Sequence, residues 1–144
     1  MKHEAIEFLI HTELSDLLKE STKLRDLYWG RTITYSRKVF VPLTNMCRNT
    51  CSYCTFVKPP GSDEARILSK NEVLEIIKQG EKKGCKEVLF SLGEKPELRY
   101  QMAKKTLKKL GFNTMIEYLK TVCELTLKES RLIPHVNAGT LSQE

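Results

Sequence analysis

Between residues 39 and 138, short apolar stretches alternate with amphipathic helical segments, and this alternation restricts the possible folds most strongly. Three stretches are short and apolar enough to be buried strands: residues 39–43, 87–92 and 132–138. Segments with helical spacing of apolar residues separate them. Strands that alternate with helices form parallel sheets with right-handed crossovers. The sequence therefore predicts an α/β fold containing about three βα units.

The predicted helices have recognisable ends. Two capping boxes of the form Ser/Thr-x-x-Glu, starting at Ser69 and Thr114, predict that helices begin directly after them. The first of these helices is expected to end near Gly84 and the second near Glu129. A basic helix is expected between them, over residues 98–110. Each predicted crossover thus contains at least one helix.

The N-terminal part of the chain has a different pattern. Apolar residues recur at near-helical spacing over residues 4–28, which predicts one helix, and Gly30 is a plausible C-cap. Residues 32–36 alternate β-prone side chains and predict a short strand or an extended arm. We therefore expect an N-terminal helical segment over residues 1–31 and an α/β core over residues 32–144.

Three βα units are too few to close a β/α barrel. Residues 140–144, after the third predicted strand, look like the cap of a further helix. A parallel edge strand without a neighbour is also a liability for a soluble protein. We therefore expect the chain to be the N-terminal part of a longer barrel protein or a truncated product.

Composition and charge indicate which cellular compartment and which classes of partner to expect. The chain has 144 residues and a net charge of +6, but its basic residues are spread along the sequence. The densest basic group lies on the predicted helix at 98–110, which favours a solvated face or a docking surface over nucleic-acid binding. No apolar run reaches the length of a membrane span, and the N-terminus lacks the apolar core of a signal peptide. We expect a cytoplasmic protein that binds neither membrane nor nucleic acid.

Three cysteines follow the first predicted strand directly. Cys47, Cys51 and Cys54 have the spacing C-x3-C-x2-C and lie within eight residues. Because they leave the end of a strand, they belong to a loop of the kind in which α/β proteins hold their chemistry. Cys85 and Cys123 are isolated and are interpreted as core residues. Three thiolates this close together predict a metal or cluster site.

The number of cysteines distinguishes the candidate metals. A tetrahedral zinc site needs a fourth ligand, and the sequence has no second C-x2-C or H-x3-H pair. In a four-iron cluster a cysteine normally binds each iron, so three cysteines leave one iron open to a ligand from outside the protein. An incomplete zinc knuckle and three unrelated core thiols remain as alternatives.

The loop resembles the cysteine loop of radical S-adenosylmethionine (SAM) enzymes, in which an aromatic residue, here Tyr53, precedes the last cysteine. The resemblance implies a 4Fe-4S cluster on Cys47, Cys51 and Cys54, with its open iron chelating the amino and carboxylate groups of SAM. Tyr53 and Phe56 are then candidates for contacts with the adenine of SAM. The alternative is that they only cover the cluster from solvent.

Two further strand ends carry candidate residues. Gly93 and Glu94 follow the second predicted strand, at the position where radical SAM proteins often carry a glycine- and glutamate-bearing segment that holds the amino group of methionine. A turn with surface charges is the alternative. If Val136 faces the helices, His135 and Asn137 point to the opposite side, the barrel interior, where they are expected to bind the cofactor or to be satisfied core residues.

Several segments together resemble one radical SAM family, the CofG subunits of deazaflavin (FO) synthase. They are the cysteine loop with residues 33–37, 41–45, 90–97 and 134–139. The sister family, CofH, shares the cysteine loop but not the Gly-Glu-Lys-Pro-Glu loop found here at 93–97, so this loop favours CofG. The resemblance covers residues 32–144 and implies the N-terminal part of a radical SAM (partial TIM-type) parallel β/α barrel, preceded by an N-terminal helix.

The resemblance also implies a reaction and partners. A deoxyadenosyl radical, made by reductive cleavage of SAM, would drive cyclisation and ammonia loss from a tyrosine–ribityldiaminouracil adduct. A CofH-type partner subunit would supply this small-molecule substrate, and a low-potential donor such as ferredoxin or flavodoxin would supply electrons. Another radical SAM enzyme, an inactive truncated fragment and a zinc-binding module are the alternative interpretations.

Overall fold

The protein is described by a computed structural model in which residues 2–141 have a defined placement. The chain divides into two compact units, Met1–Tyr35 and Ser36–Glu144. None of the described helices is both long enough and apolar enough to cross a membrane.

The first unit contains two helices, α1 (Lys2–His11) and α2 (Leu14–Trp29). The prediction of one continuous helix over residues 4–28 is therefore wrong at its centre. The break occurs because Glu13 has an extended backbone, with φ −58° and ψ 140°, and serves as the N-cap residue of α2. Gly30 ends α2 as predicted: its φ is 61° and its N–H donates to the carbonyl oxygen of Asp26.

Residues 32–36 have no regular secondary structure, so of the two predicted alternatives, a short strand and an extended arm, the strand is not formed. Strand pairing starts only at Lys38, which lies opposite Glu87 in the sheet. The alternating β-prone residues before it have no paired strand in the described chain, and alternation alone does not satisfy backbone hydrogen bonds.

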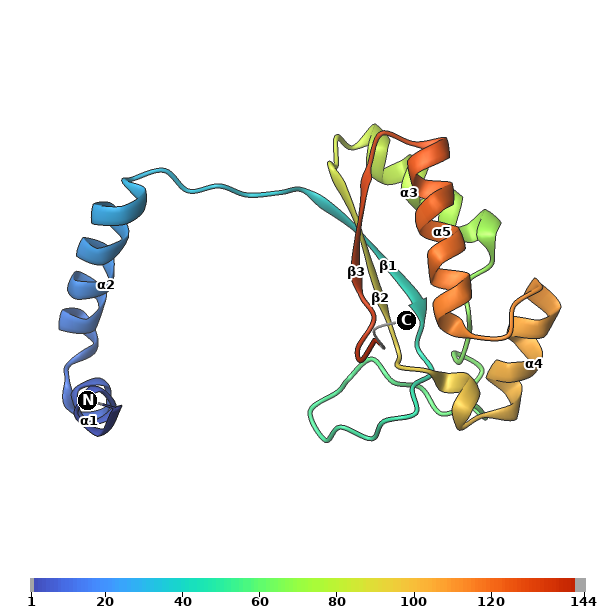
Figure 1. Ribbon diagram of the computed structural model, residues 1–144, viewed down its shortest axis with the longest axis horizontal. Helices are drawn as coiled ribbons and strands as arrows, with labels where there is room; N and C mark the ends of the chain where they lie inside the picture. The colour runs from blue at the N-terminus through green and yellow to red at the C-terminus, as the bar shows by residue number, and fades with distance from the viewer. Residues whose placement is uncertain (1, 142–144) are drawn as a thin grey trace. The chain divides into compact units, whose positions relative to one another are not determined.

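The second unit is built on a parallel sheet of three strands, β1 (Lys38–Thr44), β2 (Glu87–Leu92) and β3 (Ile133–Asn137). Their spatial order is the same as their order along the chain, as Figure 1 shows. Both neighbouring pairs are parallel. The predicted α/β fold with parallel strands is therefore confirmed.

Two helices, α3 (Lys70–Lys82) and α5 (Met115–Glu129), lie against one face of this sheet (Figure 1). Both predicted capping boxes are present. Ser69 Oγ accepts a hydrogen bond from the N–H of Glu72, and Thr114 Oγ1 accepts one from the N–H of Glu117. These caps satisfy N–H groups that have no partner inside the helix, so each helix begins at a defined residue.

The predicted basic helix begins later than expected. A short 3-10 helix, η1 (Pro96–Leu98), comes first, and α4 (Gln101–Leu110) follows it. Lys95 has a left-handed backbone, with φ 37°, and Tyr100 is extended, so a continuous helix cannot run through Tyr100 and α4 starts after it. Gly111, with φ 90°, is the C-cap of α4, so the helix ends at residue 110 as predicted.

The hydrophobic core fills the space between the sheet and its helices. Gly80 lets α3 approach β1 closely, because a Cβ atom there would lie 2.6 Å from the Cβ of Val39. Tyr118 donates its hydroxyl proton to the carbonyl oxygen of Leu68 at 2.6 Å, and its side chain is fully buried. The largest fully buried side chains are Tyr118, Phe90, Leu43, Met46, Leu68, Ile77, Leu107 and Met115.

The opposite face of the sheet is not covered by any helix among residues 36–141 (Figure 1). Phe40 and Ile133 are exposed there. Because side chains alternate along a strand, this face also carries His135 and Asn137. It is the face that would line the interior of a β/α barrel.

Candidate functional site

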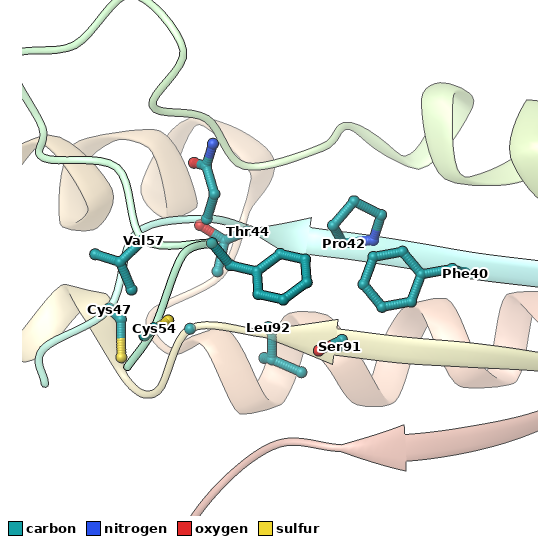
Figure 2. A pocket seen from close by; sticks show the side chains of 11 residues that line it. Phe40, Pro42, Thr44, Cys47, Cys54, Val57, Ser91 and Leu92 are labelled. Carbon is teal, nitrogen blue, oxygen red and sulfur yellow. The ribbon is translucent and has the colours of Figure 1, made fainter. Parts of the chain in front are cut away.

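A cavity of about 160 Å³ lies where β1 and β2 end. Figure 2 shows Phe40 and Pro42 on β1 toward one end of the cavity and Cys47 and Cys54 toward the other. Its lining contains Phe40, Pro42, Thr44, Asn45, Cys47, Cys54, Phe56, Val57, Ser91, Leu92 and Gly93. The structure therefore brings together four of the predicted site residues: two cysteines, an aromatic residue and the glycine after β2.

The three predicted ligand cysteines occupy one loop but differ in exposure. Cys47 is buried, Cys51 is exposed and Cys54 is half-buried. The N–H of Cys54 donates to the carbonyl oxygen of Cys51 at 3.1 Å, which makes a turn between them. Within residues 2–141, no three His, Cys, Asp or Glu side chains are gathered as ligands of one metal ion.

The donor chemistry of the loop nevertheless fits an iron–sulfur cluster. Cys47 Sγ accepts hydrogen bonds from two backbone N–H groups, those of Asn49 at 3.4 Å and Glu94 at 3.2 Å. Such N–H···S bonds stabilise negative charge on sulfur and help to set the reduction potential of a cluster. Cys51 and Cys54 lie in a segment without helix or strand, so their thiols are not fixed by secondary structure.

Cys85 and Cys123 lie apart from this loop, half-buried and packed against the core, as predicted. Burial raises the pKa of the Cys123 thiol, and the nearby Glu124 raises it further. A thiol with a raised pKa is a poorer metal ligand and nucleophile. Their surroundings therefore agree with a role in packing.

Gly93 joins the loop after β2 to the loop after β1. Its N–H donates to the carbonyl oxygen of Thr44 at 3.0 Å. A Cβ atom at Gly93 would lie 1.9 Å from the carbonyl oxygen of Met46 and 2.8 Å from the Cβ of Cys47. Only glycine permits this approach. The close contact is thus with the chain's own backbone at the start of the cysteine loop.

Glu94 is nearly buried, and both of its carboxylate oxygens are occupied. Oε1 accepts from Arg48 Nη2 at 2.7 Å, and Oε2 accepts from Asn49 Nδ2 at 2.6 Å. The hydrogen bond from Asn49 lowers the pKa of Glu94, and Arg48 lowers it further against the opposing effect of burial. Glu94 is therefore an ionised acceptor held by the cysteine loop itself.

The two residues that hold Glu94 were not predicted from the sequence. Arg48 and Asn49 lie between the first two cysteines, and Arg99 donates from Nη1 to the carbonyl oxygen of Arg48 at 2.6 Å. Their positions were the available signal. Arg48 and Asn49, which carry several N–H donors, follow β1, and the Glu94 carboxylate follows β2 at the same edge of the sheet.

The two predicted aromatic residues are in different surroundings. Phe56 lines the cavity, and its ring centroid lies 6.2 Å from that of Phe40. Tyr53 is 86% exposed and is not part of the cavity lining. Of the two, Phe56 is placed to contact a molecule in the cavity.

His135 lies on the uncovered sheet face but near the opposite ends of the strands. Its Nδ1 is 3.0 Å from Lys38 Nζ and 3.2 Å from Glu87 Oε2, and both of these residues begin their strands. Asn137 is paired in register with Ser91, which lines the cavity. Neither His135 nor Asn137 lines the cavity.

The comparisons with known proteins agree with this geometry. A family model described as the radical SAM superfamily matches residues 41–133. The chain is 44% identical over 139 residues to "FO synthase" of Nocardia farcinica, covering 90% of this chain and 16% of the relative. No solved structure gives a significant match.

Two archaeal relatives share the printed name "7,8-didemethyl-8-hydroxy-5-deazariboflavin synthase". The protein of Methanopyrus kandleri is 44% identical over 111 residues, which cover 77% of this chain and 33% of the relative. That of Methanocaldococcus jannaschii is 37% identical over 143 residues, which cover 99% of this chain and 38% of the relative. The chain thus spans between about a sixth and two fifths of the length of these relatives.

The family match covers more than half of the chain and contains all three cysteines of the loop, both neighbouring strand ends and the helices packed on the sheet. The three parallel strands with helices on one face are consistent with a partial β/α barrel of this family. The chain belongs to the radical SAM superfamily.

Proposed function

We propose that this chain provides the cluster- and SAM-binding part of a 7,8-didemethyl-8-hydroxy-5-deazariboflavin (FO) synthase. Radical SAM enzymes in general use SAM and a 4Fe-4S cluster. The observation that carries the proposal is the joining of the C-x3-C-x2-C loop to the Gly93–Glu94 segment at one end of the parallel sheet. The names of the relatives supply the reaction.

In this proposal Cys47, Cys51 and Cys54 hold three irons of the cluster and leave the fourth open to SAM. When bound and reduced, the cluster supplies the electron for cleavage of SAM to methionine and a deoxyadenosyl radical. Because the described residues do not gather three such ligands at one point, the thiols of Cys51 and Cys54 would have to approach that of Cys47 when the cluster assembles.

The chain's own residues would orient SAM and limit access of water. Phe40 and Phe56 give the cavity an apolar wall against which an adenine ring can pack. Gly93 lines the cavity, and because it has no side chain the loop after β2 can lie directly against Met46 and Cys47. Tyr53, which is exposed, would have to move inward to contact SAM.

In this proposal the substrate and partners are those implied by the resemblance to FO synthases. The radical would abstract hydrogen from a tyrosine–ribityldiaminouracil adduct, supplied by a CofH-type subunit, and cyclisation with loss of ammonia would give the deazaflavin. Residues on the uncovered sheet face, including His135 and Asn137, are candidates for contacts with this adduct. A ferredoxin or flavodoxin in the cytoplasm would supply the electron.

Electron paramagnetic resonance tests the proposal directly. Protein reconstituted anaerobically with iron and sulfide, then reduced, should give a four-iron signal that changes when SAM is added. FO formation with the partner subunit would then be assayed. A four-iron signal that does not change when SAM is added, or one zinc per chain without iron, would contradict the proposed function.

A further inference from the structure

The cysteine loop is tied to the loop after β2 by contacts that its metal-binding role does not require. Arg48 and Asn49 lie between two predicted iron ligands, yet both side chains turn to the Glu94 carboxylate at 2.7 and 2.6 Å. Arg48 is a charged donor and Asn49 a neutral one. Each donates to a different oxygen of the carboxylate.

The backbone repeats this connection. The N–H of Arg48 donates to the carbonyl oxygen of Glu94 at 3.0 Å, and the N–H of Glu94 donates to Cys47 Sγ at 3.2 Å. Glu94 is therefore linked to three consecutive residues of the loop, 47–49, through both its side chain and its backbone. Arg99 adds a link from the segment before α4 to the Arg48 carbonyl oxygen.

Burial distinguishes this arrangement from an ordinary surface ion pair. The Glu94 side chain is 11% exposed and that of Arg48 is 37% exposed. Exposed ion pairs contribute little because water screens them and their side chains lose entropy. A nearly buried carboxylate with two short charge-assisted hydrogen bonds is held more firmly, and removing one donor leaves an oxygen unsatisfied.

We propose that Arg48 and Asn49 are positioning residues that clamp Glu94, so that its backbone N–H is held against the sulfur of Cys47. The Glu94 carboxylate then serves to hold the cysteine loop. The inference rests on the proposed function for its consequence, because an N–H···S hydrogen bond to a ligand cysteine raises the reduction potential of a bound cluster.

The clamp can be tested first without any cluster. Hydrogen–deuterium exchange of the metal-free chain, read by mass spectrometry, reports opening of the two loops. Asn49→Ala and Arg48→Ala should each speed exchange in peptides covering residues 45–54 and 91–97 by about tenfold. Each variant keeps the other contact to Glu94, so the fold should persist, as circular dichroism can verify.

Matched controls come from residues with the same side chains elsewhere. Asn113→Ala changes an exposed asparagine, and Arg131→Ala changes an arginine whose side chain is 97% exposed. Neither should alter exchange in the two loops. If the clamp variants exchange no faster than these controls, the clamp is overturned.

The second measurement asks whether the clamp acts on the cluster. In reconstituted protein with equal iron content, Asn49→Ala should move the reduction potential to more negative values, whereas Asn113→Ala should not. An unchanged potential alongside faster exchange would overturn the positioning role. If the unaltered chain assembles no cluster, the proposed function fails, while the exchange comparison still decides whether the clamp exists.

Discussion

The backbone N–H of Glu94 and the sulfur of Cys47 form a hydrogen bond of 3.2 Å across 47 residues of sequence. It links the loop after β1 to the loop after β2, next to the cavity at the strand ends. Cys47 is the most buried of the three loop cysteines, and its sulfur also accepts a hydrogen bond from the N–H of Asn49.

Replacing each cysteine with serine should distinguish the cysteines that bind the cluster from those that pack in the core. Cys47→Ser, Cys51→Ser and Cys54→Ser should each abolish a stable 4Fe-4S cluster, because each removes an iron ligand. Cys85→Ser and Cys123→Ser should retain it, since both residues lie outside the loop. Iron and sulfide content after anaerobic reconstitution is the measurement. Full iron content in any loop variant would contradict the ligand assignment.

Gly93→Ala should destabilise the protein by about 3 kcal/mol, because the added Cβ would overlap the backbone carbonyl of Met46 rather than a movable side chain. Urea unfolding measures the change. Gly61→Ala is the control: a Cβ there meets no atom within 4 Å, so the expected change is within about 0.5 kcal/mol. Equal stability of the two variants would show that the two loops are farther apart than described.

Tyr118→Phe should lower the free energy of unfolding by about 1–2 kcal/mol. The substitution keeps the ring in the core but leaves the carbonyl oxygen of Leu68 without its buried donor. Tyr28→Phe, at an exposed position in α2, should leave the free energy of unfolding nearly unchanged. Chemical denaturation of both variants decides the matter. No loss in Tyr118→Phe would mean that the hydrogen bond is absent in solution.

Glu87 should make stability depend on acid pH. Hydrogen bonds from Lys38, then Ser36 and His135, lower its pKa from 4.5 to about 2. The folded state therefore favours the carboxylate. Its contribution to stability is present above pH 4.5 and is lost as the pH falls toward 2.

Glu87→Gln should consequently lose stability at neutral pH and show a smaller decline between pH 4.5 and 2 than the unaltered chain. Urea unfolding at a series of pH values measures this difference. Glu129→Gln, an exposed position at the end of α5, is the control. A Glu87 variant with the same pH profile as the unaltered chain would argue against the Lys38–Glu87 pair.

Local signals in the sequence predict the parts of the fold that depend on neighbouring residues. The capping boxes at Ser69 and Thr114 fix two helix starts correctly because each involves residues three apart. The break at Glu13 was not predicted, and for residues 32–36 the sequence left a short strand and an extended arm as alternatives. Apolar spacing does not report a single extended residue, and β-propensity does not reveal whether a partner strand exists.

The candidate site shows the same limit at longer range. The cysteine spacing identifies the loop, and the strand order brings Gly93 to the same edge of the sheet. The hydrogen bond from Asn49 to Glu94 joins residues 45 positions apart and depends on the orientation of both side chains. His135 was predicted on the correct sheet face, but alternation along a strand gives no information about its partners Lys38 and Glu87.

The order β1-β2-β3 has a consequence for synthesis of the protein on the ribosome. Each strand pairs with the one made just before it, so the sheet can grow in the direction of translation without waiting for a distant partner. The cysteine loop emerges first and is held once β2 and Glu94 have followed it. The start of the loop, at Cys47 to Asn49, would thus be held by Glu94 before β3 leaves the ribosome.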